Sequence, residues 1–258
     1  MPKATHIAIL GHSHIRALQL AEEAREHEGT SFEFLNLRDG HWCSSRRSSR
    51  GVRHYVLKPA LLSHVAELSS GDAQVGFIFS IGGNHHNVVG LTRHPEPFCF
   101  MNPWKSVDNS GKRVLPFQAV KEVMRSRMGE DLRFLRKLTG IFPRPALVLQ
   151  VPPPVQLSDT VPNLPGLETQ PYSPGRLYRK LVLRYGVESS SHRYAVWRLQ
   201  SEIQEEVCKD EGLDFFQVPG TTLDSEGFLK EQYSGDPTHG NKHYGELILQ
   251  QLEQYSGF

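Results

Sequence analysis

The chain has 258 residues, which is enough for one large α/β domain with a substantial buried core. Its 29 lysines and arginines nearly balance 28 aspartates and glutamates, and the resulting formal net charge of +1 argues against a protein whose main task is to coat nucleic acid or an anionic membrane. No apolar run approaches the roughly 20 residues needed to cross a bilayer, so we expect no membrane span.

The compartment is indicated by the N-terminus and the cysteines. The first six residues lead directly into an apolar run and lack the hydrophobic region of a signal peptide. The cysteines, Cys43, Cys99 and Cys208, are odd in number and widely spaced, which suits a reducing compartment better than a disulfide framework. We therefore expect a cytoplasmic protein.

Apolar and β-branched runs alternate with segments of helical periodicity. The runs predict five strands, at 6–10, 32–37, 75–81, 146–151 and 213–217. The segments between and after them predict amphipathic helices that begin near 13 and cover about 57–68, 120–138, 196–207 and 244–252. Such alternation predicts a parallel sheet in a single three-layer α/β/α domain over 1–258, with the active site beyond the carboxyl ends of the strands.

Two stretches exceed ordinary loop length. Residues 84–118 hold scattered aromatics, prolines and glycines, and residues 152–190 begin with three prolines. Both follow strands and therefore emerge on the predicted active-site side. They are either lids and binding loops or ordered surface coil without a catalytic part.

A possible nucleophile follows the first predicted strand, in Gly11-His12-Ser13-His14. A serine at a strand-to-helix turn exposes its hydroxyl above the sheet, where backbone N–H groups of the helix can face a developing oxyanion. The alternative is that Ser13 only caps the helix, because serine is favoured there in any case.

A possible base precedes the last predicted helix, in Asp236-Pro237-Thr238-His239. At this spacing the aspartate can accept a hydrogen bond from Nδ1–H of the imidazole, so that Nε2 faces a serine hydroxyl. The alternative is a surface turn whose aspartate caps the helix.

A third element, Gly82-Gly83-Asn84, ends the third predicted strand. Glycines allow close approach of the backbone, and the carboxamide of Asn84 can donate a hydrogen bond to an oxyanion. The alternative is an ordinary turn asparagine.

Together these three blocks resemble the SGNH hydrolase superfamily, also called GDSL esterases and lipases. The resemblance runs from the first strand to the last helix, with little identity outside the motifs. It implies a flavodoxin-like parallel sheet of about five strands. It further implies that Ser13 is the nucleophile, that His239 is the base oriented by Asp236, and that Asn84 donates to the oxyanion.

The chain departs from the family pattern at two positions. His12 stands where the usual Gly-Asp-Ser block has aspartate, which affects the packing of the loop more than the chemistry. The glycine after the second strand, whose N–H completes the oxyanion hole with that of Ser13, is either Gly40 or Gly51, and Gly40 is the better placed.

The resemblance implies a serine esterase that needs no cofactor or metal and cleaves a small-molecule or carbohydrate ester, with a short acyl or O-acetyl group preferred. One alternative is a catalytically silent binding module of the same fold. Another is a metal-dependent phosphoesterase, because His12, His14, His85 and His86 fall in one predicted mouth; few carboxylates accompany these histidines, whereas dimetal sites use bridging aspartates.

Substrate contacts are expected around the same mouth. We assign His12 and His85 to substrate binding, together with Arg46 and Arg47 from the basic segment 44–53, which also holds Arg50. That segment either meets an anionic substrate or is a mobile, solvated loop. Trp42, Phe98, Phe100 and Trp104 either offer faces to a sugar or acyl chain or lie in the core. The oligomeric state cannot be read from the sequence.

Overall fold

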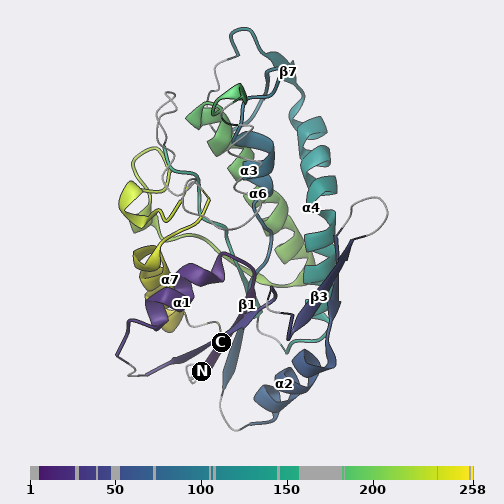
Figure 1. Ribbon diagram of the computed structural model, residues 1–258, viewed down its shortest axis with the longest axis vertical. Helices are drawn as coiled ribbons and strands as arrows, with labels where there is room; N and C mark the ends of the chain where they lie inside the picture. The colour runs from purple at the N-terminus through teal and green to yellow at the C-terminus, as the bar shows by residue number, and fades with distance from the viewer. Residues whose placement is uncertain are drawn as a thin grey trace.

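The central sheet has five parallel strands in the order β2-β1-β5-β8-β9 (Figure 1). The computed structural model describes residues 6–26, 29–38, 40–47, 53–71, 74–104, 106, 109–143, 146–156, 182, 184–236, 238–255 and 257. The sheet strands are β1 (His6–Gly11), β2 (Ser31–Asn36), β5 (Val75–Ser80), β8 (Ala146–Leu149) and β9 (Asp214–Phe216). All five predicted strands are present, with ends that differ by one or two residues, and the predicted flavodoxin-like strand order is confirmed.

Helices cover both faces of this sheet. On one face lie α1 (Ile15–Glu22) and α7 (Lys242–Gln254); on the other lie α2 (Pro59–Ser70), α4 (Phe117–Thr139) and α6 (Ser190–Glu211). Side chains alternate between the faces, so Ile7 and Ile9 of β1 pack under α1 and α7, while Ala8 and Leu10 join the core under α4 and α6. Burial on both faces explains why these strands read as continuous apolar runs.

The described ends of the basic segment, 44–47 and 53, lie in paired strands, so the expectation of a loop is wrong for these residues. Strand β3 (Cys43–Arg47) pairs antiparallel with β4 (Arg53–Leu57), and residues 48–52 lie outside the described residues. The ring of Tyr55 lies 4.8 Å from that of Phe134 on α4, which anchors the hairpin to the core. Its alternation of polar and apolar residues is too short to separate it from a loop by sequence.

The long segment 84–118 also contains regular structure that the sequence analysis did not predict. It holds α3 (His85–Gly90) and a parallel pair of strands, β6 (Phe98–Phe100) and β7 (Arg113–Leu115). Most of the other predicted loop lies at residues 157–181 and 183, outside the described residues. Two short 3-10 helices, Gly220–Thr222 and Glu231–Tyr233, precede α7. Over the residues that are described, every helix is too short or too polar to cross a membrane.

Candidate active site

The close packing of α1 against α7 brings distant parts of the chain together (Figure 1). Gly245 of α7 lies so near α1 that an added Cβ would be 2.1 Å from the carbonyl oxygen of Ala17. Ser13 immediately precedes α1, and His239 shortly precedes α7. The helix pair therefore holds both residues above the carboxyl end of β1, where the strand order of the sheet reverses.

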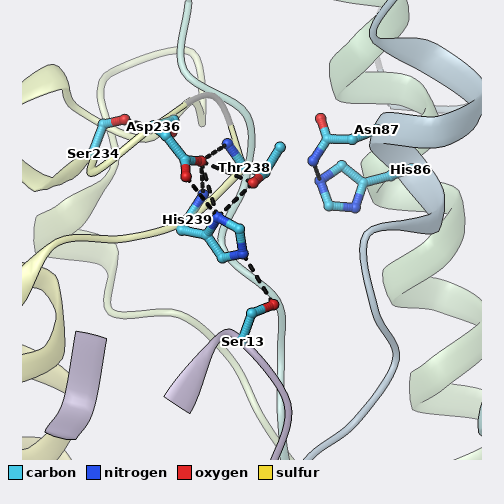
Figure 2. Close-up of polar contacts among 7 residues, drawn as sticks. All are labelled: Ser13, His86, Asn87, Ser234, Asp236, Thr238 and His239. Atoms are coloured by element: carbon cyan, nitrogen blue, oxygen red, sulfur yellow. Dashed lines mark hydrogen bonds and ion pairs between the residues drawn. The ribbon is translucent and has the colours of Figure 1, made fainter. Parts of the chain in front are cut away.

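Ser13 lies in the turn between β1 and α1, and its hydroxyl is not used as a helix cap. The N-cap residue of α1 is His14, and it too makes no side-chain capping bond. The hydroxyl of Ser13 instead lies 3.0 Å from Nε2 of His239 (Figure 2). The interpretation of Ser13 as a simple cap is therefore wrong.

The loop before α7 holds His239 and Asp236 in one tight turn. The backbone N–H of Gly235 donates to the carbonyl of His239 at 2.8 Å, which closes the loop. Asn241 caps α7, because its side chain accepts the N–H groups of His243 and Tyr244 at 3.0 and 3.2 Å. The cap of α7 is therefore Asn241 and not Asp236, contrary to the alternative weighed for the aspartate.

Asp236 orients the imidazole of His239. Nδ1 of His239 lies 2.8 Å from Oδ2 and 3.0 Å from Oδ1 of the carboxylate (Figure 2). Three further donors hold Oδ1: the N–H of His239 at 2.9 Å, and the N–H and hydroxyl of Thr238 at 2.7 and 2.8 Å. Nδ1 thus carries the proton, and Nε2 is left to accept one from Ser13.

The same contacts keep Asp236 ionised. Burial by itself raises the pKa of this carboxyl group, but the hydrogen bond and charge of His239 and the donors of Thr238 oppose burial and lower the pKa to about 2. A carboxylate that accepts several N–H bonds is stabilised in its charged form. Asp236 can therefore stabilise an imidazolium on His239.

Asn84 presents a free amide donor beside the triad. It begins α3 without a side-chain capping bond, and its carboxamide oxygen is buried. That oxygen has no hydrogen-bond partner among the described residues. The Nδ2 donor makes no hydrogen bond to the described residues, so it is available to an oxyanion.

Gly40 follows β2 at the same edge of the sheet as Ser13 and Asn84, which follow β1 and β5. It is exposed, has a φ of +50°, and its carbonyl accepts a hydrogen bond from Nζ of Lys58. This bond uses the carbonyl of Gly40, so the N–H of Gly40 takes no part in it. The other candidate, Gly51, lies outside the described residues.

The histidines of the mouth each have protein partners. The ring of His14 lies 4.9 Å from that of His239, and His12 lies 5.0 Å from the ring of Tyr55. His85 contacts Asp131 at 2.8 Å. His86 is held by Gln200 and by Asn87, across from the triad (Figure 2). Among the described residues, no group of three or more metal-ligating side chains is arranged to hold a metal ion.

The candidate substrate contacts differ in their surroundings. His12 is buried, whereas His85 is half-buried. Arg46 and Arg47 lie on β3, but their side chains are outside the described part, as is Arg50. Of the aromatics, Phe100 is buried, and Trp42 and Trp104 pack against the core. Phe98 meets the ring of His192 at 5.2 Å. These contacts favour the core alternative over a sugar-binding face.

Several polar side chains near the site were not found by sequence reasoning. Thr238 donates to Asp236, Asp131 pairs with His85, and Gln200 and Gln204 of α6 bond the backbone after β5. The two glutamines, four residues apart, share one face of a predicted helix. In the sequence, these two glutamines could have been found only as polar residues on an otherwise apolar helix face.

The buried histidines His14 and His86 predict that acid destabilises the protein. Burial lowers the pKa of His86 to about 3 and that of His14 well below its ordinary value of 6.5. Below about pH 6.5 these two histidines bind more protons in the unfolded chain than in the folded one. The contribution of the two neutral side chains to stability is therefore full above about pH 6.5 and is lost as the pH falls toward their folded-state pKa values.

Each such histidine adds a slope of about 1.4 kcal/mol per pH unit to the free energy of unfolding in this window. Urea unfolding between about pH 4 and 7 measures the slope. His14→Gln should lower it by about one proton. An unaltered slope in His14→Gln would contradict the prediction.

The comparisons with known proteins find similarity at the level of structure. No family profile and no curated protein matches the chain. Similar solved structures include a carbohydrate acetylesterase from Sinorhizobium meliloti, with 14% identity, 96% of this chain and 98% of that chain covered, and a TM-score of 0.40. A GDSL-like lipase from Bacteroides thetaiotaomicron has 12% identity, coverage of 97% and 88%, and a TM-score of 0.37.

An aryl esterase from M. smegmatis is similar with 12% identity, coverage of 97% and 98%, and a TM-score of 0.40. These similarities concern the fold alone. At this level of similarity the chemistry of the site has to be argued from its own side chains.

Proposed function

We propose that the protein is a serine ester hydrolase that works through Ser13, His239 and Asp236. The observation that carries the proposal is the continuous chain of hydrogen bonds from Oγ of Ser13, through both ring nitrogens of His239, to the carboxylate of Asp236. A hydroxyl needs such a base to become a nucleophile, and the base needs an orienting group. A structural role alone does not require both hydrogen bonds in this order.

The reaction proceeds through an acyl-enzyme. Oγ of Ser13 attacks the ester carbonyl while Nε2 of His239 accepts its proton, and Asp236 stabilises the imidazolium. The oxyanion accepts hydrogen bonds from the N–H groups of Ser13 and Gly40 and from Nδ2 of Asn84. His239 then protonates the leaving alcohol as the C–O bond breaks, and water hydrolyses the acyl-enzyme by the same route in reverse. No cofactor takes part.

The substrate is proposed to be a small-molecule or carbohydrate ester with a short acyl group. Polar side chains contact the catalytic imidazole: the ring of His14 lies against that of His239, and the hydroxyl of Thr238 lies beside its Nδ1. Such groups suit a polar ester better than a long alkyl chain. We also propose that the protein is cytoplasmic, because its three cysteines are buried free thiols, as suits a reducing compartment.

The first test is covalent labelling. A fluorophosphonate probe should form one adduct, on the peptide that contains Ser13, because only a serine activated by a base reacts readily. Mass spectrometry of the digested protein locates the adduct. Absence of labelling together with absence of esterase turnover would overturn the proposal and favour a silent binding module. Activity lost on chelation, without labelling, would favour a metal-dependent phosphoesterase.

The second test is chain length. With p-nitrophenyl esters, we expect kcat/KM to be highest for acetate and to fall by about tenfold or more by the octanoate, because the polar surroundings of Ser13 give a longer chain little apolar surface to contact. Initial rates over a series from acetate to octanoate measure this. An increase with chain length would contradict the short-acyl preference while leaving the triad intact.

A further inference from the structure

Two glutamines of α6 bind the backbone segment that carries Asn84. Gln200 and Gln204 are buried, with 0% and 1% of their surfaces exposed. Nε2 of Gln204 donates to the carbonyl of Ile81 at 2.9 Å, and Gln200 contacts the next residues of the same segment. A buried carboxamide is costly unless it is hydrogen-bonded. Gln204 has this one bond from Nε2, and its Oε1 has no partner among the described residues, so Gln200 is the better satisfied of the two.

Gln200 makes four hydrogen bonds, which fix the orientation of its amide. Its Oε1 accepts the backbone N–H of His86 at 2.7 Å and the Nδ1–H of the same residue at 3.0 Å. Its Nε2 donates to the carbonyls of Gly82 and Gly83, both at 3.1 Å. Because a backbone N–H can only donate and a carbonyl can only accept, the reversed amide would lose the three bonds to the backbone.

The protonation of His86 agrees with this arrangement. Its Nδ1 carries the proton given to Gln200, and Nε2 accepts from Nδ2 of Asn87 at 2.9 Å (Figure 2). Burial lowers the pKa of His86 to about 3, so the ring is neutral near pH 7. The partners of Gln200 therefore stay the same over the working pH range.

The glycines need these bonds because of their backbone conformation. Gly82 and Gly83 have φ values of +139° and +57°, outside the strand geometry in which a neighbouring strand would bind their carbonyls. The segment is also in close contact with α6, since a Cβ on Gly82 would lie 2.0 Å from Nε2 of Gln204. The segment therefore has little room to shift against the helix.

Asn84 lies between the residues that Gln200 holds, and its own side chain makes no capping bond. Gln200 bonds the two residues before Asn84 and the second residue after it. We infer that Gln200 is a positioning residue that places the Nδ2 donor of Asn84 in the oxyanion hole. This inference rests on the proposed function for the chemistry, and on the four hydrogen bonds for the geometry.

The consequence for catalysis is specific to the transition state. A hydrogen-bond donor stabilises an oxyanion only where its distance and direction are right, and a misplacement of about 1 Å can cost up to 10²-fold in rate. Loss of Gln200 should therefore lower kcat and kcat/KM equally and leave KM nearly unchanged, because the ground-state carbonyl needs the donor much less.

The test is a double-mutant cycle with Gln200→Met and Asn84→Ala. Gln200→Met keeps the length of the side chain and removes all four hydrogen bonds. We expect it to lower kcat by about tenfold or more, and Asn84→Ala to lower kcat by about 10²- to 10³-fold. In the double variant, the kcat should match that of Asn84→Ala to within about threefold, because Gln200 acts through Asn84.

Ser201→Ala is the matched control. Ser201 is the next residue on α6, is buried, and accepts a hydrogen bond from Nε2 of Gln150 at 3.0 Å, without a bond to residues 81–86. It should lower the melting temperature and leave kcat unchanged. A purely structural role for Gln200 would give equal fold losses in both Asn84 backgrounds, and that result would overturn the inference.

Two further measurements keep the outcome interpretable. If Gln200→Met does not fold, Gln200→Glu, which keeps the acceptor for His86 and removes the N–H donors to the glycines, replaces it in the same cycle. If the wild-type protein has no esterase turnover, the proposed function fails by itself. The positioning inference is then judged by amide hydrogen exchange at residues 82–86, which should rise in the Gln200 variant and not in Ser201→Ala; unchanged protection would overturn it.

Discussion

Ser13→Ala should lower kcat for ester hydrolysis by at least about 10⁴-fold and abolish labelling by a fluorophosphonate. The substitution removes the only atom that the proposed mechanism bonds to the acyl group, while His239 and the oxyanion donors stay in place. Residual turnover would come from water activated directly by His239 and from the oxyanion hole. Steady-state kinetics with p-nitrophenyl acetate measures the effect.

The fold should tolerate this change. The hydroxyl of Ser13 has one hydrogen bond to His239, worth about 1 kcal/mol, and caps no helix. Ser69→Ala is a matched control, since its hydroxyl donates to the carbonyl of Val65 on α2 at 2.6 Å and does not touch the triad. Full turnover in Ser13→Ala, with both variants folded, would show that the reaction has another nucleophile.

Asp236→Asn should lower kcat by about 10⁴-fold through the proton on His239. The oxygen of the new carboxamide can still accept the backbone N–H groups of Thr238 and His239, so the loop keeps its shape. Its NH₂ group donates to Nδ1 of His239 and so moves the ring proton to Nε2. A protonated Nε2 cannot accept the proton of Ser13, and the nucleophile is not activated.

The lowered pKa of Asp236 also makes the stability of the folded protein depend on pH in acid. The folded-state pKa of Asp236, about 2, lies below the ordinary value of 3.8, so its contribution to stability is full above pH 3.8 and is lost as the pH falls toward 2. Asp236→Asn should lack this acid-dependent loss as well as activity. Kinetics at pH 7 and unfolding from about pH 5 down to 2 measure the two effects.

Asp224→Asn is the control for the loop chemistry. Oδ1 of Asp224 accepts the backbone N–H groups of Glu226 and Phe228 at 2.8 and 3.0 Å, much as Asp236 holds its own loop, but it has no bond to the triad. It should retain activity. A loss of less than about tenfold in Asp236→Asn would mean that the carboxylate does not set the proton on His239.

The regular elements were readable because their signals are local. Five apolar runs separated by amphipathic segments required a parallel sheet with helices on both faces, and the structure has these elements in the flavodoxin-like order. The hairpin of β3 and β4 and the pair of β6 and β7 were missed. Each of these strands has five residues or fewer, and without a long period the chain there reads as loop.

The site was readable only in part. Parallel topology brings the carboxyl ends of neighbouring strands to one edge, which is why residues after β1 and β5 were expected to meet. The side chains that hold them were missed, because Gln200 and Thr238 carry no pattern of their own and owe their partners to packing between elements far apart in sequence.

The printed residues were enough to predict the type of sheet, whereas the order of its strands was expected from the resemblance to a known family. They were also enough to choose Ser13, Asn84, Asp236 and His239 as candidate site residues, since each lies in a short motif next to a predicted strand or helix. The 3.0 Å contact across 226 positions, and the glutamine that holds the Asn84 segment, arise from how α7 packs on α1 and α6 on the loop after β5. Such distances depend on the close fit of many buried side chains at once, which no single stretch of the chain encodes.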